Sequence, residues 1–381
     1  MEETKIKISV TKNNSAEENK PEVKKDPEVK NKNESEKISE LRQDLVTGDW
    51  VVVSAIRGRR PDEFVAQRSE PLLDPRATPP QPSPEYRGGG VDDCLFCDPV
   101  ASGQEKDVLI YETAEGDWSL RVFPNKFPAF ASPKGGVLRH KEEGPYFWMD
   151  SVGYHEVIVT RDHTRHIGQM EPLAVAEILD AYQSRYIDLM NKKSVNYIDI
   201  IHNHGRSAGA SIPHPHSQLM AIPVVSPYVV SELDGAEDYH RQNKTCVYCS
   251  MIEWENENGK RVVFENDDFL VFCPFASRAN FEMWVMPKKH KPYFERISTA
   301  EKMSAGEALH EAVRRLCEGL NNPDFNFYIH TSPCDGKDYP HFHWHIEIVP
   351  KLNIWAGFEI STGIEIITMR PEEAASFLRS K

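Results

Sequence analysis

The sequence predicts an α+β fold built from two similar halves, and the order of its motifs is the main reason. In each half, a C-x-x-C pair precedes two strand-like runs, a histidine, a long helical stretch, another strand, a turn and a P-H-x-H motif. His163 and His214 are 51 positions apart (214 − 163), and His290 and His341 are also 51 apart (341 − 290). Because order and spacing both recur, we infer an internal duplication.

The individual elements follow from periodicity and from turn residues. Short β-branched and aromatic runs bounded by turns predict strands, and apolar residues spaced three or four apart predict helices. Strands are expected at 50–54, 120–123, 155–160, 197–201, 269–272, 281–286 and 325–329, and helices at 171–192 and 299–320. Residues 1–40 are polar with few apolar side chains, which is typical of a disordered tail. We place the two halves at 41–232 and 233–381.

Composition limits the classes of function. The chain has 381 residues, a formal net charge of −14 and an isoelectric point near 5.6. This charge argues against general binding to nucleic acid or to anionic membranes. No apolar run approaches the roughly 18 residues that a membrane-spanning helix needs. The charged N-terminus does not resemble a signal peptide, so we expect a cytoplasmic protein.

The motif at 211–218 is the centre of the predicted chemistry. It follows a glycine-containing turn and leads into an apolar run, so it is expected to enter a strand. Side chains alternate along a strand, which places His214, His216 and Gln218 on one face. Two imidazoles and an amide on one face suit phosphoryl chemistry. The alternative is a pair of ordinary surface or core histidines.

The cysteines and the repeated histidines predict two metal sites. Two cysteines and two histidines per half form the Cys₂His₂ set of a closed, tetrahedral, structural zinc site. The expected ligands are Cys94, Cys97, His163 and His214 in the first half, and Cys246, Cys249, His290 and His341 in the second. Four protein ligands leave no open position for water, so the metals would be structural. The alternative is cysteine pairs that are buried without metal.

With His214 assigned to metal, His216 remains free as a nucleophile. A neutral imidazole is abundant at cytosolic pH, and attack on a phosphate ester would give a phosphohistidine-type intermediate. Gln218 can donate an amide hydrogen to a phosphoryl oxygen. In the second half, the corresponding residues would be His343 and His345. The basic run 57–61 can supply arginines to phosphate, or it can be an ordinary solvated loop.

These residues resemble the galactose-1-phosphate uridylyltransferase family, within the histidine-triad superfamily. The resemblance rests on His214-Pro215-His216-Ser217-Gln218, on the upstream C-x-x-C and on the runs 47–51 and 57–61, and it extends from Arg42 to the C-terminus. It implies two histidine-triad-like halves, each an antiparallel sheet with flanking helices, and commonly a homodimer. It also implies a ping-pong reaction in which His216 takes uridylyl from UDP-glucose, releases glucose 1-phosphate and passes the group to galactose 1-phosphate.

The resemblance also implies roles for further residues. Arg57 and Arg60 would meet substrate phosphates, and Asn125 and Phe127 would line the nucleotide pocket. Asn203, Ser211 and Gln218 would hold the phosphoryl group. Phe358 and Glu359, in a Gly-Phe-Glu run that matches the family's Gly-Tyr-Glu, would lie near the hexose. The implied cofactors are two structural Zn²⁺ ions, and the implied partners are a nucleotide sugar and a sugar phosphate, without nucleic acid or membrane.

Several positions depart from the family pattern. Lys126 stands where an acidic residue is usual, Ile212 where asparagine is usual, and 353–354 reads Asn-Ile rather than Lys-Phe. These departures resemble a branch that includes ADP-glucose phosphorylase, which moves adenylyl to phosphate. The same motifs are also compatible with a histidine-triad hydrolase that uses the second half, and with a zinc-stapled nucleotide-binding module without catalysis.

Overall fold

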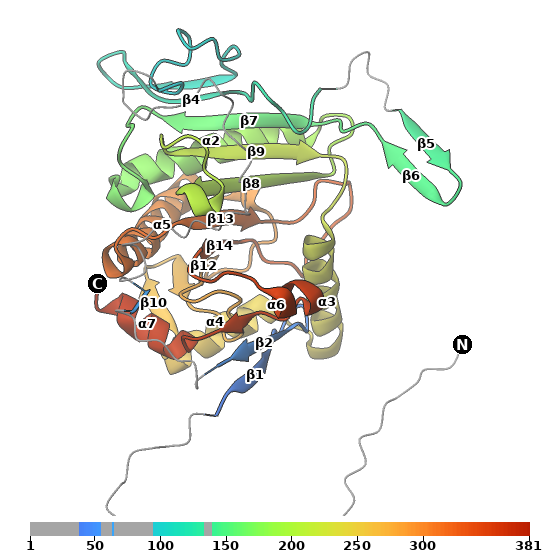
Figure 1. Cartoon of the computed structure of the whole chain (residues 1–381), viewed down its shortest axis with the longest axis vertical. Coiled ribbons are helices and arrows are strands. Elements are labelled where there is room, and N and C mark those ends of the chain that lie inside the picture. The colour runs from blue at the N-terminus through green and yellow to red at the C-terminus, as the bar shows by residue number, and fades with distance from the viewer. Residues whose placement is uncertain (1–37, 55–62, 65–93, 133–138) are drawn as a thin grey trace, which may run out of the picture. The chain divides into compact units, whose positions relative to one another are not determined.

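The computed structural model describes residues 38–54, 63–64, 94–132 and 139–381. Within these ranges, a ten-stranded antiparallel sheet crosses the molecule in the order β10-β11-β12-β14-β13-β8-β9-β7-β4-β3 (Figure 1). The strands are β3 (Leu109–Glu112), β4 (Trp118–Pro124), β7 (Tyr154–Thr160), β8 (Tyr197–His204), β9 (His216–Ile222), β10 (Val262–Glu265), β11 (Phe269–Phe272), β12 (Met283–Pro287), β13 (Phe325–His330) and β14 (His345–Pro350). The expected α+β class with antiparallel strands and helices is therefore confirmed.

The two halves meet in the middle of this sheet. From its outer edge to the centre, the first half contributes β3-β4-β7-β9-β8 and the second contributes β10-β11-β12-β14-β13. These two series follow the same order, as an internal repeat would require. The join is the antiparallel pair β8–β13, in which Asn203 lies opposite Asn326. Residues 38–381 form one compact unit, and the expected boundary at 232/233 falls inside the helix α3 (Pro227–Asn243).

Two long helices cover one face of the sheet. They are α2 (Pro172–Met190) and α5 (Thr299–Leu320), close to the predicted ranges. Proline occupies the first turn of α2, and Ser298 and Glu301 form a capping box at the start of α5. The helices approach closely at Gly306, where a Cβ atom would come within 2.8 Å of the Ala176 nitrogen. A glycine inside a helix is explained here by the neighbouring backbone.

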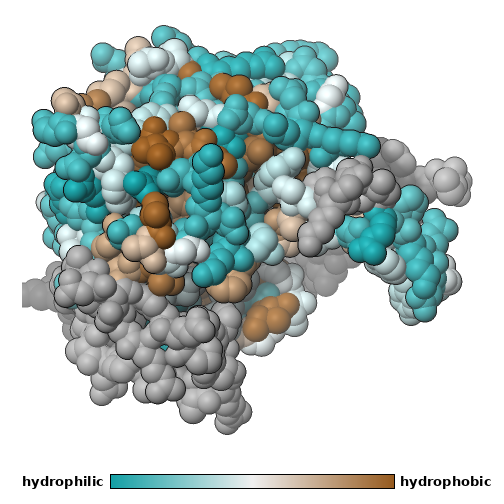
Figure 2. Space-filling view, turned by 90° about the horizontal axis from the view of Figure 1, so that it is seen from above, coloured by the Kyte–Doolittle hydropathy of each residue, from teal (hydrophilic) through white to brown (hydrophobic). Residues whose placement is uncertain are grey.

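The other face of the sheet is covered differently in each half. In the second half, α3 and α4 (Val247–Asn258) pack against it around Leu233, Tyr248 and Trp284. In the first half, the loop that carries Cys94 and Phe96 lies there instead. Seen from above, the first half presents a mainly hydrophilic surface with separate hydrophobic patches (Figure 2).

Smaller elements complete the molecule. They are β1 (Glu40–Gln43), β2 (Trp50–Val53) and β15 (Ile366–Ile367) in a second sheet, the hairpin β5 (His140–Glu143) and β6 (Tyr146–Met149), the short helices η5 (Ile167–Gln169), η6 (Arg206–Ala208) and η7 (Phe294–Arg296), and α6 (Gly357–Thr362) and α7 (Pro371–Arg379). Sequence reasoning missed the hairpin and the helices α3 and α4. Most of the expected tail, 1–37, lies outside the described residues. Every helix described here is too short or too polar to cross a bilayer.

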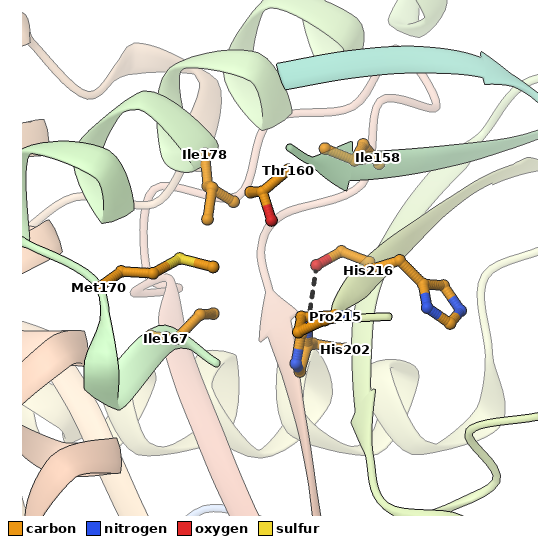
Figure 3. Close-up of a pocket in the computed structure, with 9 residues that line it drawn as sticks. Ile158, Thr160, Ile167, Met170, Ile178, His202, Pro215 and His216 are labelled. Atoms are coloured by element: carbon orange, nitrogen blue, oxygen red, sulfur yellow. Dashed lines mark hydrogen bonds between the residues drawn. The ribbon is translucent and has the colours of Figure 1, made fainter. Parts of the chain in front are cut away.

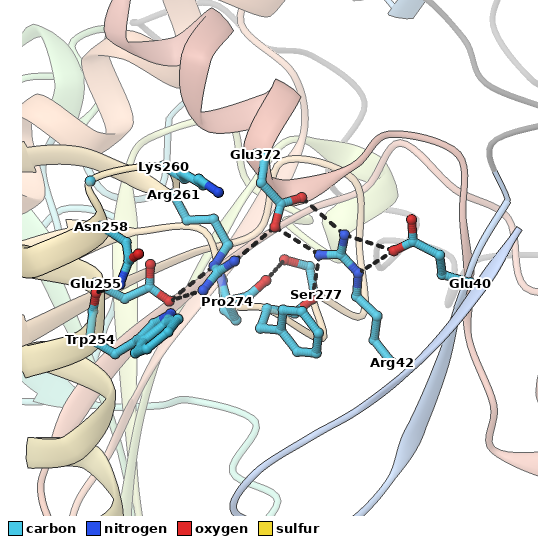
Figure 4. A network of polar contacts seen from close by, with 12 residues as sticks. Glu40, Arg42, Trp254, Glu255, Asn258, Lys260, Arg261, Pro274, Ser277 and Glu372 are labelled. Atoms are coloured by element: carbon cyan, nitrogen blue, oxygen red, sulfur yellow. Dashed lines mark hydrogen bonds and ion pairs between the residues drawn. The ribbon is translucent and has the colours of Figure 1, made fainter. Parts of the chain in front are cut away.

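An ion network joins the N-terminal strand β1 to the C-terminal helix α7 (Figure 4). The Arg42 guanidinium donates to both carboxylate oxygens of Glu372, at 3.0 and 3.1 Å, and Arg261 donates to the same side chain at 2.8 Å. Arg261 also binds Glu255, and both arginines lie over the ring of Phe275. Both guanidiniums are less than one-tenth exposed, so they depend on these carboxylates for compensation.

Replacing Glu372 by Ala is expected to lower the free energy of unfolding by about 3 kcal/mol, because two buried cations lose a shared partner. Urea denaturation measures this. The matched control is Glu318→Ala, which breaks a more exposed helix pair with Arg314 and should cost less than about 1 kcal/mol. A loss at Glu372 no larger than at Glu318 would contradict the proposed role of the network.

The same contact predicts a dependence on pH. Burial raises the pKa of Glu372, but the hydrogen bonds from Arg42 and Arg261 outweigh it and hold the pKa below its ordinary value of 4.5. A lowered folded-state pKa stabilises the fold above the unfolded-state pKa, and this stabilisation is lost as pH falls. Wild type should therefore lose more stability below about pH 4.5 than Glu372→Gln does.

Candidate active site and metal centres

The His214-Pro215-His216 motif lies at the start of β9, beside the glycine turn that follows β8. Gly205 and Gly209 bracket η6 with φ of 83° and 93°, values that favour glycine. Along β9, Ser217, Leu219 and Ala221 face the α2–α5 side, where the last two join the main core. The alternation places His216 and Gln218 on the opposite face.

The backbone fixes the orientation of the His216 ring. Its Nδ1 lies 2.8 Å from the carbonyl oxygen of His214. A carbonyl only accepts, so Nδ1 carries the hydrogen and Nε2 keeps its lone pair. Phe96, between the two cysteines of the C-x-x-C pair, packs edge-on against the ring with centroids 5.1 Å apart. Burial lowers the pKa of His216, which favours the neutral form of the ring.

A polar network contacts β9 on the face that is opposite to His216 and Gln218. The Ser217 hydroxyl binds both the Tyr182 hydroxyl of α2 and Nδ1 of His202, the latter at 2.9 Å. His202 also stacks on Phe327. Figure 3 shows this side of the sheet, where a cavity of about 10 Å³ lies between the helices and β9, and the His216 imidazole points away from it. This cavity is too small for a substrate. His202, to which the sequence assigned no role, thus contacts β9 through Ser217.

Several residues predicted to bind substrate lie on, or next to, the face of the sheet that is opposite to α2 and α5. The Asn125 Oδ1 accepts from the Phe127 backbone nitrogen at 2.9 Å, and Phe127 is 77% exposed. The Asn203 Oδ1 accepts from Asn326 Nδ2 at 2.7 Å, and Ser211 is exposed in the turn. Asn326 also lines a cavity of about 260 Å³ on this face, together with Arg278, Tyr328, Lys351, Asn353 and Trp355.

Of the other predicted residues, Phe358 and Glu359 lie away from His216 within one chain (Figure 1). Arg57 and Arg60 lie outside the described residues. Phe358 and Glu359 belong to α6, which lies well below β9 in the view of Figure 1, and His216 is the first residue of β9. The Glu359 carboxylate accepts from the Ala356 backbone nitrogen at 3.0 Å and so caps its own helix.

The first Cys₂His₂ set converges as its sequence spacing predicts. Cys94, Cys97, His163 and His214 each offer one ligand atom, and these atoms lie within 4.8 Å of one another. The Sγ-to-Nδ1 distances are 3.2, 3.5 and 3.6 Å. A tetrahedral zinc with ordinary bond lengths would separate sulfur from nitrogen by about 3.5 Å. His214 Nε2 lies 2.7 Å from the Thr160 carbonyl, which leaves Nδ1 free to bind metal.

The second set corrects one prediction, because its fourth member is His343 and not His341. Cys246, Cys249, His290 and His343 form the cluster. Cys249 Sγ lies 3.4 Å from His290 Nδ1 and 3.6 Å from His343 Nδ1, and Nε2 of His343 faces the Pro287 carbonyl at 2.9 Å. His343 lies two residues before β14, as His214 lies two residues before β9. The relevant spacing is therefore 53 (343 − 290), and the equal spacing of 51 was misleading.

Both clusters fit a closed zinc site by donor type, distance and ring tautomer. Such an ion would hold the C-x-x-C segments to the sheet and would leave no position for a reacting water. The counterparts of His216 and Gln218 in the second half are consequently His345 and Glu347, not His343 and His345. His345 Nδ1 faces the His343 carbonyl at 3.0 Å, which repeats the arrangement at His216. His345 is fully buried, however.

A third group went unnoticed in the sequence. Glu232, His330, His345 and Glu347 are buried, and one ligand atom of each lies within 4.8 Å of the others. Burial lowers the pKa of His330, but the two carboxylates outweigh it and raise the pKa to about 10. Glu347 also accepts from Arg278 Nη2 at 2.7 Å. These donors can hold a cation, and their charges are also compensated by one another. The sequence offered one signal for this group: His345 and Glu347 are two residues apart, which places both side chains on one face of a strand.

Comparisons with known proteins agree with this architecture. The family profile for the N-terminal domain of galactose-1-phosphate uridyl transferase matches residues 28–226, and a domain of unknown function, DUF4921, matches residues 145–379. ADP-glucose phosphorylase from Arabidopsis thaliana is 33% identical over 89% of this chain and 92% of that relative. Galactose-1-phosphate uridylyltransferase from Thermotoga maritima is 29% identical over 90% of this chain and 98% of that protein.

A solved structure gives the same result for the whole fold. The crystal structure of the Arabidopsis thaliana ADP-glucose phosphorylase with bound ADP-glucose has a TM-score of 0.72 at 29% identity, and covers 90% of this chain and 99% of that chain. The matches thus extend over both halves of the chain. The chain therefore belongs to the galactose-1-phosphate uridyl transferase family.

Proposed function

We propose that the protein is a nucleotidyltransferase in which His216 carries a nucleoside monophosphate between two phosphate-bearing substrates. One observation carries the proposal. Nδ1 of His216 donates a hydrogen bond to the His214 carbonyl, so that Nε2 presents a lone pair on the same strand face as Gln218. The second half does not offer the same chemistry, because Nε2 of His345, the counterpart of His216, lies 3.3 Å from the Glu347 carboxylate and the ring is fully buried. This favours a reaction at the first half over the alternative of a hydrolase that uses the second half.

The reaction has two balanced steps. In the first, Nε2 of His216 bonds to the α-phosphorus, the bond from that phosphorus to the bridging oxygen breaks, and the sugar 1-phosphate leaves with the electron pair. In the second, a phosphate oxygen of the acceptor attacks the same phosphorus, and the nitrogen–phosphorus bond breaks. Neither step needs a proton or an oxidant. A neutral imidazole nitrogen attacks in the first step, and the leaving oxygen of the first step and the attacking oxygen of the second are both anionic.

Two specific reactions would proceed through a nucleotidyl-histidine intermediate of this kind. The first is uridylyl transfer from UDP-glucose to galactose 1-phosphate, which is supported by the family profile and by relatives that carry this name. The second is phosphorolysis of ADP-glucose, which is favoured by the Arabidopsis thaliana relative and by Lys126 and Ile212. They differ in the base of the donor and in whether the acceptor is a sugar phosphate or phosphate.

We also propose that two copies of the chain form a homodimer. Phe358 and Glu359 are remote from His216 in one chain, and α6 and its approach expose Ile354, Trp355 and Ile360 at 61–73%. Burying such a patch against a second copy is favourable. Light scattering should then give about twice the chain mass of 43.5 kDa. A mass of one chain would contradict this arrangement.

The decisive experiment incubates the protein separately with UDP-glucose and ADP-glucose, without an acceptor. The readouts are release of glucose 1-phosphate and an intact-mass gain of one nucleoside monophosphate. A uridylyl adduct that galactose 1-phosphate discharges supports the first reaction. An adenylyl adduct that phosphate discharges supports the second. Absence of both adducts would overturn nucleotidyl transfer from these donors.

A further inference from the structure

His155 lies between two of the amides on the catalytic face, and it was not among the predicted site residues. It comes from β7, neighbour of β9 in the sheet, and is 9% exposed. Its Nε2 lies 2.8 Å from Gln218 Oε1 and 3.2 Å from Asn125 Nδ2. Its Nδ1 lies 3.2 Å from the backbone nitrogen of Ala129. One ring therefore contacts the catalytic strand and the segment that carries Asn125.

The backbone contact decides which ring nitrogen carries the hydrogen. A backbone N–H can only donate, so Nδ1 of His155 accepts from Ala129 and has no hydrogen of its own. A neutral ring then carries its hydrogen on Nε2. Burial lowers the pKa of His155, which keeps the ring neutral. His155 is thus a neutral imidazole with its hydrogen directed at the Gln218 side chain.

This tautomer fixes the orientation of the Gln218 amide. The Nε2 hydrogen of His155 needs an acceptor, and Oε1 of Gln218 is the acceptor at 2.8 Å. The Gln218 amide nitrogen must then point away from His155. The amide of Asn125 is also fixed, because its Oδ1 accepts from the Phe127 backbone. Since the His155 Nε2 has no lone pair to offer, the hydrogens of the Asn125 amide remain available to another acceptor.

We propose that His155 is a positioning residue that holds Gln218 with its amide nitrogen turned toward the reacting phosphoryl group. The proposal rests on the nucleotidyl transfer proposed above. Phosphoryl oxygens only accept hydrogen bonds, so a flipped glutamine would present its own oxygen to them and repel them. An imidazole that donates to Oε1 prevents this flip before substrate arrives. A donor fixed in advance is the arrangement that stabilises charge in a transition state.

The test compares three variants in single-turnover formation of the nucleotidyl adduct. His155→Phe keeps a ring but removes both nitrogens, and it should slow adduct formation at least about tenfold, since losing a fixed donor costs roughly 10²–10³. His155→Gln restores an amide donor and should recover most of the rate. The affinity for the nucleotide sugar, measured by titration, should change less than the rate of adduct formation. His240→Phe removes an exposed imidazole on α3 and is the matched control.

A double-mutant cycle separates positioning from an independent role. If His155 acts through Gln218, then His155→Phe should cause no further loss in a Gln218→Ala background. Full additivity, or a wild-type rate in His155→Phe, would overturn the proposal. Independently, ¹⁵N NMR of histidine-labelled protein should find the His155 hydrogen on Nε2. A hydrogen on Nδ1 would overturn the positioning role of His155, whether or not the wild-type protein forms an adduct. Absence of an adduct in the wild-type protein would instead contradict only the proposed nucleotidyl transfer.

Discussion

Replacing His216 by Asn is expected to abolish the covalent adduct and to reduce turnover by about 10⁴-fold or more, as loss of a catalytic nucleophile does. Asparagine fits the space and can still donate to the His214 carbonyl, but it has no lone pair on nitrogen that can attack phosphorus. Intact-mass analysis after incubation with the accepted nucleotide sugar measures the adduct directly. Bound zinc and the unfolding midpoint should remain close to wild type.

The matched control for this variant is His341→Asn. His341 lies in the second half, outside all three Cys/His/carboxylate groups found among the described residues. The His341→Asn variant should therefore form the adduct at the wild-type level. A nucleotidyl adduct that persists in His216→Asn would assign the nucleophile elsewhere. An adduct lost equally in both variants would mean that the assay reports folding rather than chemistry, and unfolding curves of the two proteins distinguish that case.

We expect each Cys₂His₂ cluster to bind one zinc ion, so replacing His343 by Ala should lower the zinc content by one ion per chain, whereas replacing His341 by Ala should not change it. The reason is geometric: His343 Nδ1 lies 3.6 Å from Cys249 Sγ, and His341 is outside the cluster. Binding at a structural zinc site contributes to folding, with apparent free energies of about 10–16 kcal/mol in zinc-finger peptides. The His343 variant should therefore unfold at a markedly lower temperature.

Elemental analysis of purified protein measures the zinc content, and Cys97→Ser tests the first cluster in the same way. Because Cys97 Sγ lies 3.2 Å from His163 Nδ1, that substitution should weaken the site that anchors the loop carrying Phe96 against His216. It should thus slow adduct formation as well as lower stability. Equal metal content in His341→Ala and His343→Ala would contradict the corrected assignment.

Local chemistry could be inferred from the chain alone. The alternation of His216, Ser217 and Gln218 in a strand follows from the two-residue period of extended backbone, and the structure has that strand. The helix Thr299–Leu320 begins and ends as predicted, because its capping box and apolar period are local signals. The first Cys₂His₂ set was also predictable, since residue type and paired spacing limit which side chains can converge.

What the sequence could not decide depended on contacts between distant residues. The choice of His343 over His341 depends on where the chain enters β14, and a turn two residues longer defeats an argument from equal spacing. The contact between His155 and Gln218 joins positions 63 residues apart, and only strand pairing in the folded sheet brings them to one face. Residue types therefore determined the available chemistry. The register of non-local strands decided which of those residues meet, because sheet hydrogen bonding fixes neighbours that no local pattern specifies.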